Sequence, residues 1–286
     1  MSTITNSVNS VQINSDSLRL RHQAGESIAA LAKEISSTIS WQRLWTMLYP
    51  SAPAGEQPAL QCNGAAGSLT EKYRPTSLDA IWGQGRVVKV LRKFAANPYP
   101  TAFVFDGETG TGKTSAALAL AAALGCDLPQ KEFGGVRTIA SGEQSADAVR
   151  DAYQQMFNCP WHGSGWKVVI ANEADRMARP AETIWLDVLE AIPARTVIIF
   201  TTNEAGRLSQ RFLDRCTRLT FESDAEKLRA SATALATAVW KAETGKQPAP
   251  AQVHQIVQAT EADGQLSFRR LMQHLTVALG LEDSYE

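Results

Sequence analysis

The chain has 286 residues, of which 44 % are hydrophobic and 20 % are charged, so it is long enough for about two domains with their own cores. This composition excludes collagen-like, disulfide-scaffold and wholly disordered proteins. The 28 basic and 29 acidic residues leave a formal net charge of −1, which gives no overall attraction to nucleic acid or to an anionic membrane. A polyanion would therefore have to be bound at a local site.

The cysteines and the apolar runs bear on where the protein resides. The four cysteines lie far apart, without C-x-x-C spacing, which favours a reduced cytosolic protein: Cys62, Cys126, Cys159 and Cys216. Cys159 and His162 form a single C-x-x-H pair, which without a second pair is more typical of a loop than of a zinc site. No signal peptide is visible, and the longest strongly apolar run, residues 116–124, is far shorter than the roughly twenty residues that span a bilayer. We therefore expect a soluble cytoplasmic protein with no membrane partner.

The N-terminal part combines a polar arm with two helical patterns. Residues 1–15 are too polar to offset the entropy of ordering, so we expect a disordered arm. Within residues 16–50, apolar side chains repeat at helical spacing on both sides of a short connector, which predicts a small unit similar to a helix-turn-helix. Residues 40–49 are the expected recognition helix. Its polar face would carry Gln42, Arg43 and Thr46. DNA contact and protein docking both remain open for this unit.

A linker separates this unit from two larger ones. Residues 51–68 are rich in Pro, Gly, Ala and Ser and have no periodicity, which predicts a flexible linker. From 69 to 222, short continuous apolar strands alternate with helical stretches, which predicts an α/β core with a parallel sheet covered by helices on both faces. The expected strands are 101–105, 167–171 and 196–201. Residues 223–286 contain only helical patterns, over 226–244 and 266–281, and predict a small all-helical domain.

A phosphate-binding loop directly follows the first expected strand. The sequence matches G-x-x-x-x-G-K-[ST] and leads into a helix-forming run, so glycine turns and a helix N-terminus would together surround a phosphate. Lys113 would reach the outer phosphates, and the Thr114 hydroxyl would bind Mg²⁺. The residues expected to contact nucleotide are Gly107, Glu108, Thr109, Gly110, Thr111, Gly112, Lys113, Thr114 and Ser115. A nucleoside triphosphate site is the strongest inference from these residues.

The end of the strand at 167–171 carries the expected catalytic and metal residues. In P-loop proteins an acidic pair at this position holds the hydrated metal ion and orients the attacking water. Here Glu173 stands where the water-orienting carboxylate is expected, whereas Asn172 replaces the aspartate that normally holds Mg²⁺. An amide brings no negative charge, so metal affinity should fall while nucleotide binding survives. A slow or inactive ATPase is the alternative that this departure raises.

Together these motifs resemble the AAA+ ATPases, and most closely the clamp-loader ATPase subunits. The stretch Glu71-Lys72-Tyr73-Arg74-Pro75, followed by Leu78 to Gln84, is similar to the signature with which those subunits cover the nucleotide base. The resemblance therefore assigns Tyr73, Arg74 and Pro75 to nucleotide binding and the segment 223–286 to the lid. It further makes Asn203 the sensor of the γ-phosphate, Arg215 an arginine finger offered to a neighbouring subunit, and Arg269, with Arg270 second, the lid sensor.

Two departures limit this resemblance. Clamp-loader subunits carry a helical collar domain after the lid, and this chain is too short to hold one. The stretch 184–190 lacks the basic residues with which that family faces DNA. We therefore do not expect a clamp-loading pentamer. The arginines also have a simpler interpretation, in which Arg215 and Arg269 only form surface ion pairs.

Three function classes follow. We favour an ATP- and Mg²⁺-dependent AAA+ ATPase that assembles with itself as a ring or filament and acts on DNA in replication, recombination or transposition. The second is a clamp-loader-like enzyme that acts on a replication or recombination protein. The third is an ATP-bound assembly scaffold in which Asn172 prevents turnover.

Overall fold

The computed structural model describes residues 58–63, 68–130 and 133–281. The expected arm at 1–15, the helical unit at 16–50 and most of the linker at 51–68 lie outside the described residues. All strands described below belong to one sheet.

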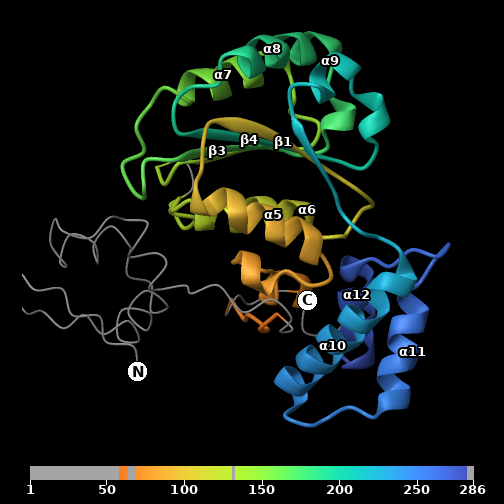
Figure 1. Cartoon of the computed structure of the whole chain (residues 1–286). Coiled ribbons are helices and arrows are strands. Elements are labelled where there is room, and N and C mark those ends of the chain that lie inside the picture. Colours follow the sequence, from red (N-terminus) through yellow and green to blue (C-terminus); the bar gives the residue numbers. More distant parts are fainter. Residues whose placement is uncertain (1–57, 64–67, 131–132, 282–286) are drawn as a thin grey trace, which may run out of the picture.

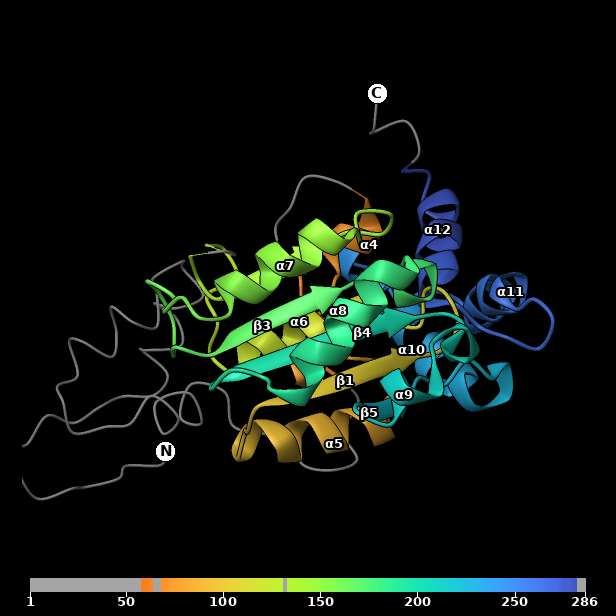
Figure 2. The ribbon, with the colours of Figure 1, turned by 90° about the horizontal axis from the view of Figure 1, so that it is seen from above.

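A five-stranded sheet, in the order β2-β3-β4-β1-β5, forms the centre of the molecule, and every pair of neighbouring strands is parallel (Figures 1 and 2). Its strands are β1 (Thr101–Asp106), β2 (Val136–Ile139), β3 (Lys167–Ala171), β4 (Thr196–Thr202) and β5 (Thr217–Thr220). The central strand β4 is buried along its whole length. Its apolar run at residues 197–200 is typical of a strand that has helices on both sides.

Two helical layers cover the sheet (Figure 1). One layer holds α5 (Gly85–Ala96) and α6 (Lys113–Ala123), and the other holds α7 (Ala146–Gln155), α8 (Arg179–Glu190) and α9 (Gln210–Leu213). Alternate residues of β1 enter different cores, because successive side chains of a strand point to opposite faces. Phe103 and Phe105 pack with α5 and α6, whereas Val104 packs with the other layer. The predicted α/β class, with a parallel sheet covered on both faces, is confirmed.

A helical bundle follows β5. It consists of α10 (Ala225–Thr244), α11 (Pro250–Thr260) and α12 (Phe268–Ala278), which contact one another. The side chain of Asp224 caps the first turn of α10, and Gly245 ends that helix in the left-handed conformation at φ 68°. The short helix α4 (Leu69–Lys72) comes before the sheet in sequence, yet Leu69 and Tyr73 pack into the core of this bundle.

Short 3₁₀ turns complete the described part: η1 (Leu78–Ala80), η2 (Ala174–Arg176) and η3 (Ala205–Arg207). Two residues separate β3 from η2, and two separate β4 from η3. Within the described residues, no helix combines the length and the apolar character needed to cross a bilayer.

The three strands expected from apolar runs are confirmed as β1, β3 and β4, with one extra residue at the ends of β1 and β4. The sequence analysis did not identify β2 and β5, because each has only four residues and lies at a sheet edge. Three of the four residues of β5 are exposed, so this strand carries no apolar run that would have revealed it.

Candidate functional site

A cavity of about 400 Å³ opens where the carboxyl ends of the strands meet the helical bundle. Its walls come from segments that are distant in sequence. They include the glycine loop (Thr109–Ser115), the residues after β2 (Ala140 and Ser141), the end of β3 (Asn172 and Glu173), the end of β4 (Thr201–Asn203), the segment Tyr73–Pro75, Ile81 and Trp82, and Leu235, Phe268, Arg269 and Met272 from the bundle. Ligands of open parallel sheets bind at this edge of the strands.

The glycine loop connects β1 to α6. Gly112 adopts φ 99° immediately before α6 begins at Lys113, a conformation that side-chain-bearing residues rarely adopt. The chain therefore turns sharply from the sheet into the helix. The N-terminal end of α6, with its partial positive charge, lies at the cavity.

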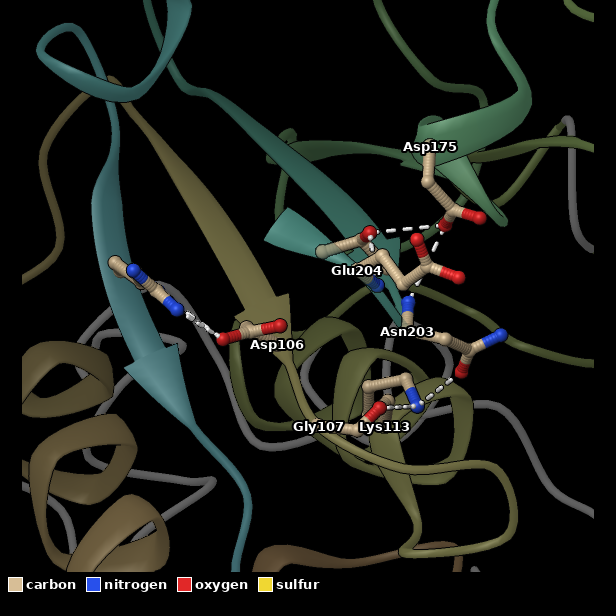
Figure 3. Close-up of polar contacts among 8 residues, drawn as sticks. Asp106, Gly107, Lys113, Asp175, Asn203 and Glu204 are labelled. Carbon is tan, nitrogen blue, oxygen red and sulfur yellow. Dashed lines mark hydrogen bonds and ion pairs between the residues drawn. The ribbon is translucent and has the colours of Figure 1, made fainter. Parts of the chain in front are cut away.

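Lys113 is buried at the base of this loop. Its Nζ donates hydrogen bonds to the carbonyl oxygen of Gly107 at 2.7 Å and to Asn203 Oδ1 at 2.9 Å (Figure 3). A third bond reaches the carbonyl oxygen of Glu108 at 2.9 Å. Burial lowers the pKa of Lys113 to about 8, and nearby carboxylates, Asp106 first, only partly oppose this effect. The lysine therefore reaches the cavity with all three of its donors already directed at oxygen atoms.

Asn172 occupies the position expected for a metal-holding carboxylate. Its Oδ1 accepts hydrogen bonds from the hydroxyls of Thr114 at 3.1 Å and Thr201 at 3.2 Å. The Thr114 hydroxyl and the Asn172 amide oxygen are both ligands of the type that Mg²⁺ accepts, but neither carries a negative charge. These residues therefore fit Mg²⁺ when phosphate oxygens complete its ligand set. In the described part of the chain, His, Cys, Asp and Glu side chains form no group of three or more that could hold a metal ion.

Glu173 is held in a left-handed backbone conformation at φ 53°, which is uncommon for a residue with a side chain. Two side chains fix the peptide groups around it. Gln144 donates to the carbonyl oxygen of Asn172, and the Glu173 N–H donates to Thr201 Oγ1 at 3.2 Å. The carboxylate accepts a hydrogen bond from Ser141 and forms an ion pair with Arg176 at 3.1 Å. Glu173 therefore lies at the cavity, and the nearby guanidinium of Arg176 partly offsets its negative charge.

The end of β4 is fixed by Asp175. One of its carboxylate oxygens accepts hydrogen bonds from Thr202 Oγ1 at 2.9 Å and from the Asn203 backbone N–H at 3.2 Å (Figure 3). On the other side of the glycine loop, Asp106 accepts a hydrogen bond from Arg218 Nε at 3.1 Å. The first two bonds attach the end of β4 to η2, and the third attaches the end of β1 to β5.

Gln84 attaches the glycine loop to the segment that leads into the bundle. The residue is only 2 % exposed. Its Nε2 donates to the carbonyl oxygens of Thr111 at 3.3 Å and Glu222 at 2.9 Å, and its Oε1 accepts from the Glu222 N–H at 2.9 Å. All the polar contacts of this amide are therefore made inside the protein.

The structure brings most of the residues expected from the sequence to one place. Tyr73, Arg74, Pro75, Lys113, Thr114, Ser115, Asn172, Glu173, Asn203 and Arg269 all line the cavity, as do Thr109 to Gly112. Gly107 and Glu108 do not line it, but their carbonyl oxygens receive the hydrogen bonds of Lys113. Of the two lid arginines considered, Arg270 is not among the lining residues.

Arg215 lies away from the cavity of its own chain. Its guanidinium forms an ion pair with Glu190 and donates to the Arg211 carbonyl oxygen at 2.9 Å. The interpretation of Arg215 as a surface ion-pairing residue and its interpretation as a finger for a neighbouring subunit both agree with this location.

Several residues of the site were not expected from the sequence. Ser141 and Gln144 carry no motif, whereas Thr201 and Asp175 lie in stretches similar to the AAA+ motifs but were given no role. The contacts of all four join segments that only the fold brings together. Gln84 belongs to the stretch that resembles the clamp-loader signature, so the sequence held a signal for it. That signal did not indicate a contact with the glycine loop.

Comparisons with known proteins concern the family and the fold. Residues 83–225, half of the chain, match the protein family described as DNA polymerase III, delta subunit. Replication factor C subunit 3 of Saccharomyces cerevisiae is 32 % identical over 160 residues, which cover 53 % of this chain and 44 % of that protein. A Replication factor C small subunit of Picrophilus torridus is 31 % identical over 153 residues, with 53 % and 48 % covered. The matches thus span about half the length of these relatives.

Solved structures also share the fold. The Thermotoga maritima RuvB Holliday junction branch migration motor aligns with a TM-score of 0.56 at 15 % identity and covers 74 % of this chain and 66 % of that chain. At this identity, the likeness concerns the arrangement of strands and helices. Together with the family match over half of the sequence, the order of the motifs shows that the chain belongs to the clamp-loader-like AAA+ family described as DNA polymerase III, delta subunit.

Proposed function

We propose that the chain binds ATP with Mg²⁺, hydrolyses it, and assembles with copies of itself into a ring or filament that acts on DNA in replication, recombination or transposition. The observation that carries this proposal is the convergence of Lys113, Glu173 and Asn203 on one cavity. Family membership supports it independently, since the relatives named above are replication factors.

The proposed reaction is the in-line attack of water on the γ-phosphate. The glycine loop and Lys113 bind the phosphates, and Thr114 and Asn172 provide the ligands that would hold Mg²⁺. When bound, Mg²⁺ would supply positive charge to the β- and γ-phosphates. Glu173 and Asn203 orient the water, and Arg269 couples the position of the lid to the state of the nucleotide. Because Asn172 is neutral, we expect slow turnover.

Arg215 completes the site of a neighbouring copy in this proposal. Its guanidinium is partly exposed, at 32 % for the side chain, and it lies outside the cavity of its own chain. A planar guanidinium stays charged and can contact phosphate oxygens in a bidentate manner. Hydrolysis would then require assembly, and turnover per chain would rise with protein concentration.

The test uses the purified full chain and its Lys113→Ala variant. We expect the parent protein to bind ATP and to form rings or filaments in electron micrographs taken with a slowly hydrolysed ATP analogue, in the presence or absence of DNA. The variant should do neither, because it lacks the charge that contacts the phosphates. A parent protein that stays monomeric and ignores millimolar ATP would refute the proposal.

Two other functions are each favoured by one specific observation. A clamp-loader-like activity on a protein partner is favoured by the family match, and it predicts nucleotide-dependent binding to a sliding clamp. An ATP-bound scaffold is favoured by Asn172, and it predicts ATP that is retained without turnover.

Stimulation of ATP hydrolysis by DNA would support the DNA-acting ATPase over the clamp-loader-like enzyme and the ATP-bound scaffold. Loss of that stimulation in Arg43→Glu would assign the DNA contact to residues 16–50.

A further inference from the structure

The cavity has two chemically different ends. One end holds the polar groups of the glycine loop and the strand ends. The other is mainly apolar and is formed by Tyr73, Pro75, Ile81, Leu235 and Met272. A triphosphate suits the first end, and a flat base suits the second, because ring faces pack well against aromatic and aliphatic side chains.

Tyr73 belongs to the bundle by packing, although it precedes the sheet in sequence. Tyr73 is 5 % exposed and lies in the same hydrophobic cluster as Leu235, Val239 and Met272 of α10 and α12. The base end of the cavity is therefore built largely on the bundle, whereas the phosphate end is built on the sheet. A nucleotide would connect these two parts.

Glu243, in the last turn of α10, contacts Lys72 and Tyr73. Its carboxylate accepts a hydrogen bond from the Tyr73 hydroxyl and forms an ion pair with Lys72 at 2.8 Å. The Glu243 side chain is 13 % exposed and does not line the cavity. The Tyr73 ring thus lies between the cavity on one side and a largely buried carboxylate at its hydroxyl.

The protonation states of Tyr73 and Glu243 favour a strong hydrogen bond between their side chains. Burial and the hydrogen bond to Glu243 raise the pKa of Tyr73, so its hydroxyl remains a donor. Burial alone would raise the pKa of Glu243, but the hydrogen bonds from Lys72 and Tyr73 outweigh it and lower that pKa. The carboxylate is therefore ionised at neutral pH, and hydrogen bonds to an ionised acceptor are the stronger kind.

The backbone on both sides of Tyr73 is fixed as well. The Asn63 N–H donates to the Lys72 carbonyl oxygen at 2.9 Å, and Asn63 Nδ2 donates to the Arg74 carbonyl oxygen at 2.9 Å. The main chain and the hydroxyl of Tyr73 are thus held from different directions. The Lys72 ammonium lies over the Tyr73 ring, 5.6 Å from its centroid, and Tyr73 also lines the cavity.

We infer that Glu243 is a positioning residue for base recognition: it acts through Tyr73 and makes the affinity for the base depend on the place of the lid helix α10. This inference rests on the proposed function, since it concerns the same nucleotide site. It separates two parts of the affinity, one from the phosphates and one from the base, and only the second should depend on Glu243.

The experiment measures, by calorimetry on the full chain, the binding of ADP and of inorganic tripolyphosphate, which has no base. We expect Glu243→Ala and Tyr73→Phe each to weaken ADP binding about five- to tenfold and to leave tripolyphosphate binding unchanged. The double variant should lose no more than either single variant, because both changes break the same bond. Glu243→Gln, whose amide oxygen can still accept from Tyr73, should regain most of the ADP affinity.

Glu226→Ala is the matched control, because Glu226 is an exposed carboxylate in the first turn of the same helix. It should bind both ligands as the parent does. Equal weakening of ADP and tripolyphosphate in Glu243→Ala would mean that the bond only stabilises the fold, and would overturn the inference. Unchanged ADP binding in Glu243→Ala would overturn it too. A parent chain that binds neither ligand would instead refute the proposed function.

Discussion

Lys113 Nζ lies 2.9 Å from Asn203 Oδ1, so the lysine of the glycine loop is bonded to the residue that follows β4. The other two donors of Lys113 meet the carbonyl oxygens of Gly107 and Glu108. A phosphate that binds this ammonium group must compete with these oxygens. A phosphate that takes this place would free Asn203 Oδ1 from its hydrogen bond with Lys113, so the contacts of Asn203 would change when the phosphate binds.

The first prediction concerns pH. The pKa of Lys113 is lowered to about 8 by burial, and only the ammonium form attracts phosphate. Above about pH 8 the neutral amine must gain a proton before ATP binds. The apparent Kd should therefore rise by up to about tenfold per pH unit, whereas below this pH it should be flat. Calorimetry between about pH 7 and about pH 9.5 checks this, with proton uptake expected at the upper end.

Lys113→Arg is the control for this prediction, since a guanidinium does not titrate in this range. If the variant binds ATP at all, its affinity should not change with pH across the window. An equal pH dependence in the parent and the variant would assign the titration to another group.

The second prediction concerns the neutral residue in the metal site. Asn172→Asp restores a negative charge next to Thr114, so we expect turnover to rise about tenfold or more and half-saturation to need less Mg²⁺. Steady-state ATPase assays over a Mg²⁺ titration measure both. Asn172→Ala, which removes the oxygen without adding charge, should not accelerate the reaction. An unchanged or lower rate in Asn172→Asp would contradict the idea that the missing charge limits the metal site.

The sequence predicted the parts of this molecule that depend on local pattern. The strands β1, β3 and β4 are buried on both faces. Strands of this kind contain continuous apolar runs, and such runs are recognisable in the sequence alone. The glycine loop was equally visible, because a turn that requires φ 99° at Gly112 permits few other residues. Residues that directly follow β3 and β4, which the sequence analysis expected at one site, line one cavity in the structure.

The contacts that join distant segments were not predictable in this way. The bond between Tyr73 and Glu243 links residues 170 positions apart, and the bonds of Gln84 to Glu222 span 138 positions. A single tyrosine or glutamine carries no periodicity, and its partner is chosen only when the sheet and the bundle pack together. For the same reason, the inclusion of α4 in the bundle core could not be derived from the four residues that form it.

The third prediction tests the buried amide of Gln84. Gln84→Ala would leave the Thr111 and Glu222 backbone groups without their partner, and we expect unfolding to require about 2–3 kcal/mol less free energy. Thermal and denaturant unfolding measure this loss. Gln154→Ala on the exposed side of α7 should stay within about 0.5 kcal/mol of the parent. A similar small effect at both positions would show that the Gln84 bonds contribute little.

The fourth prediction concerns the contact between the glycine loop and α12. Gly110 has φ +80°, and a Cβ there would lie 2.1 Å from Ser267 Oγ and 2.9 Å from Arg269 Cβ. Gly110→Ala should therefore push the start of α12 away from the loop, weaken ATP binding about tenfold or more, and lower stability by about 1–3 kcal/mol. Gly85→Ala is the control, since a Cβ there meets open space at the start of α5. Equal ATP affinity in the two variants would contradict this account.

The last prediction places Arg215 in the site of a neighbouring copy. Because this guanidinium pairs with Glu190 and does not line its own cavity, Arg215→Ala should bind ATP as tightly as the parent while turnover falls about a thousandfold. Arg211→Ala, an exposed arginine one turn earlier, should stay near the parent rate. Mixing the Arg215→Ala chain with a Glu173→Gln chain, which keeps Lys113 and should therefore still bind ATP and assemble, then separates action in trans from action in cis. Each chain alone should be inactive, but at an equal ratio about a quarter of random contacts join an intact Glu173 to an intact arginine. The mixture should recover up to about that share of the parent activity. A mixture that stays inactive although both chains assemble would mean that Arg215 does not act across the contact between copies.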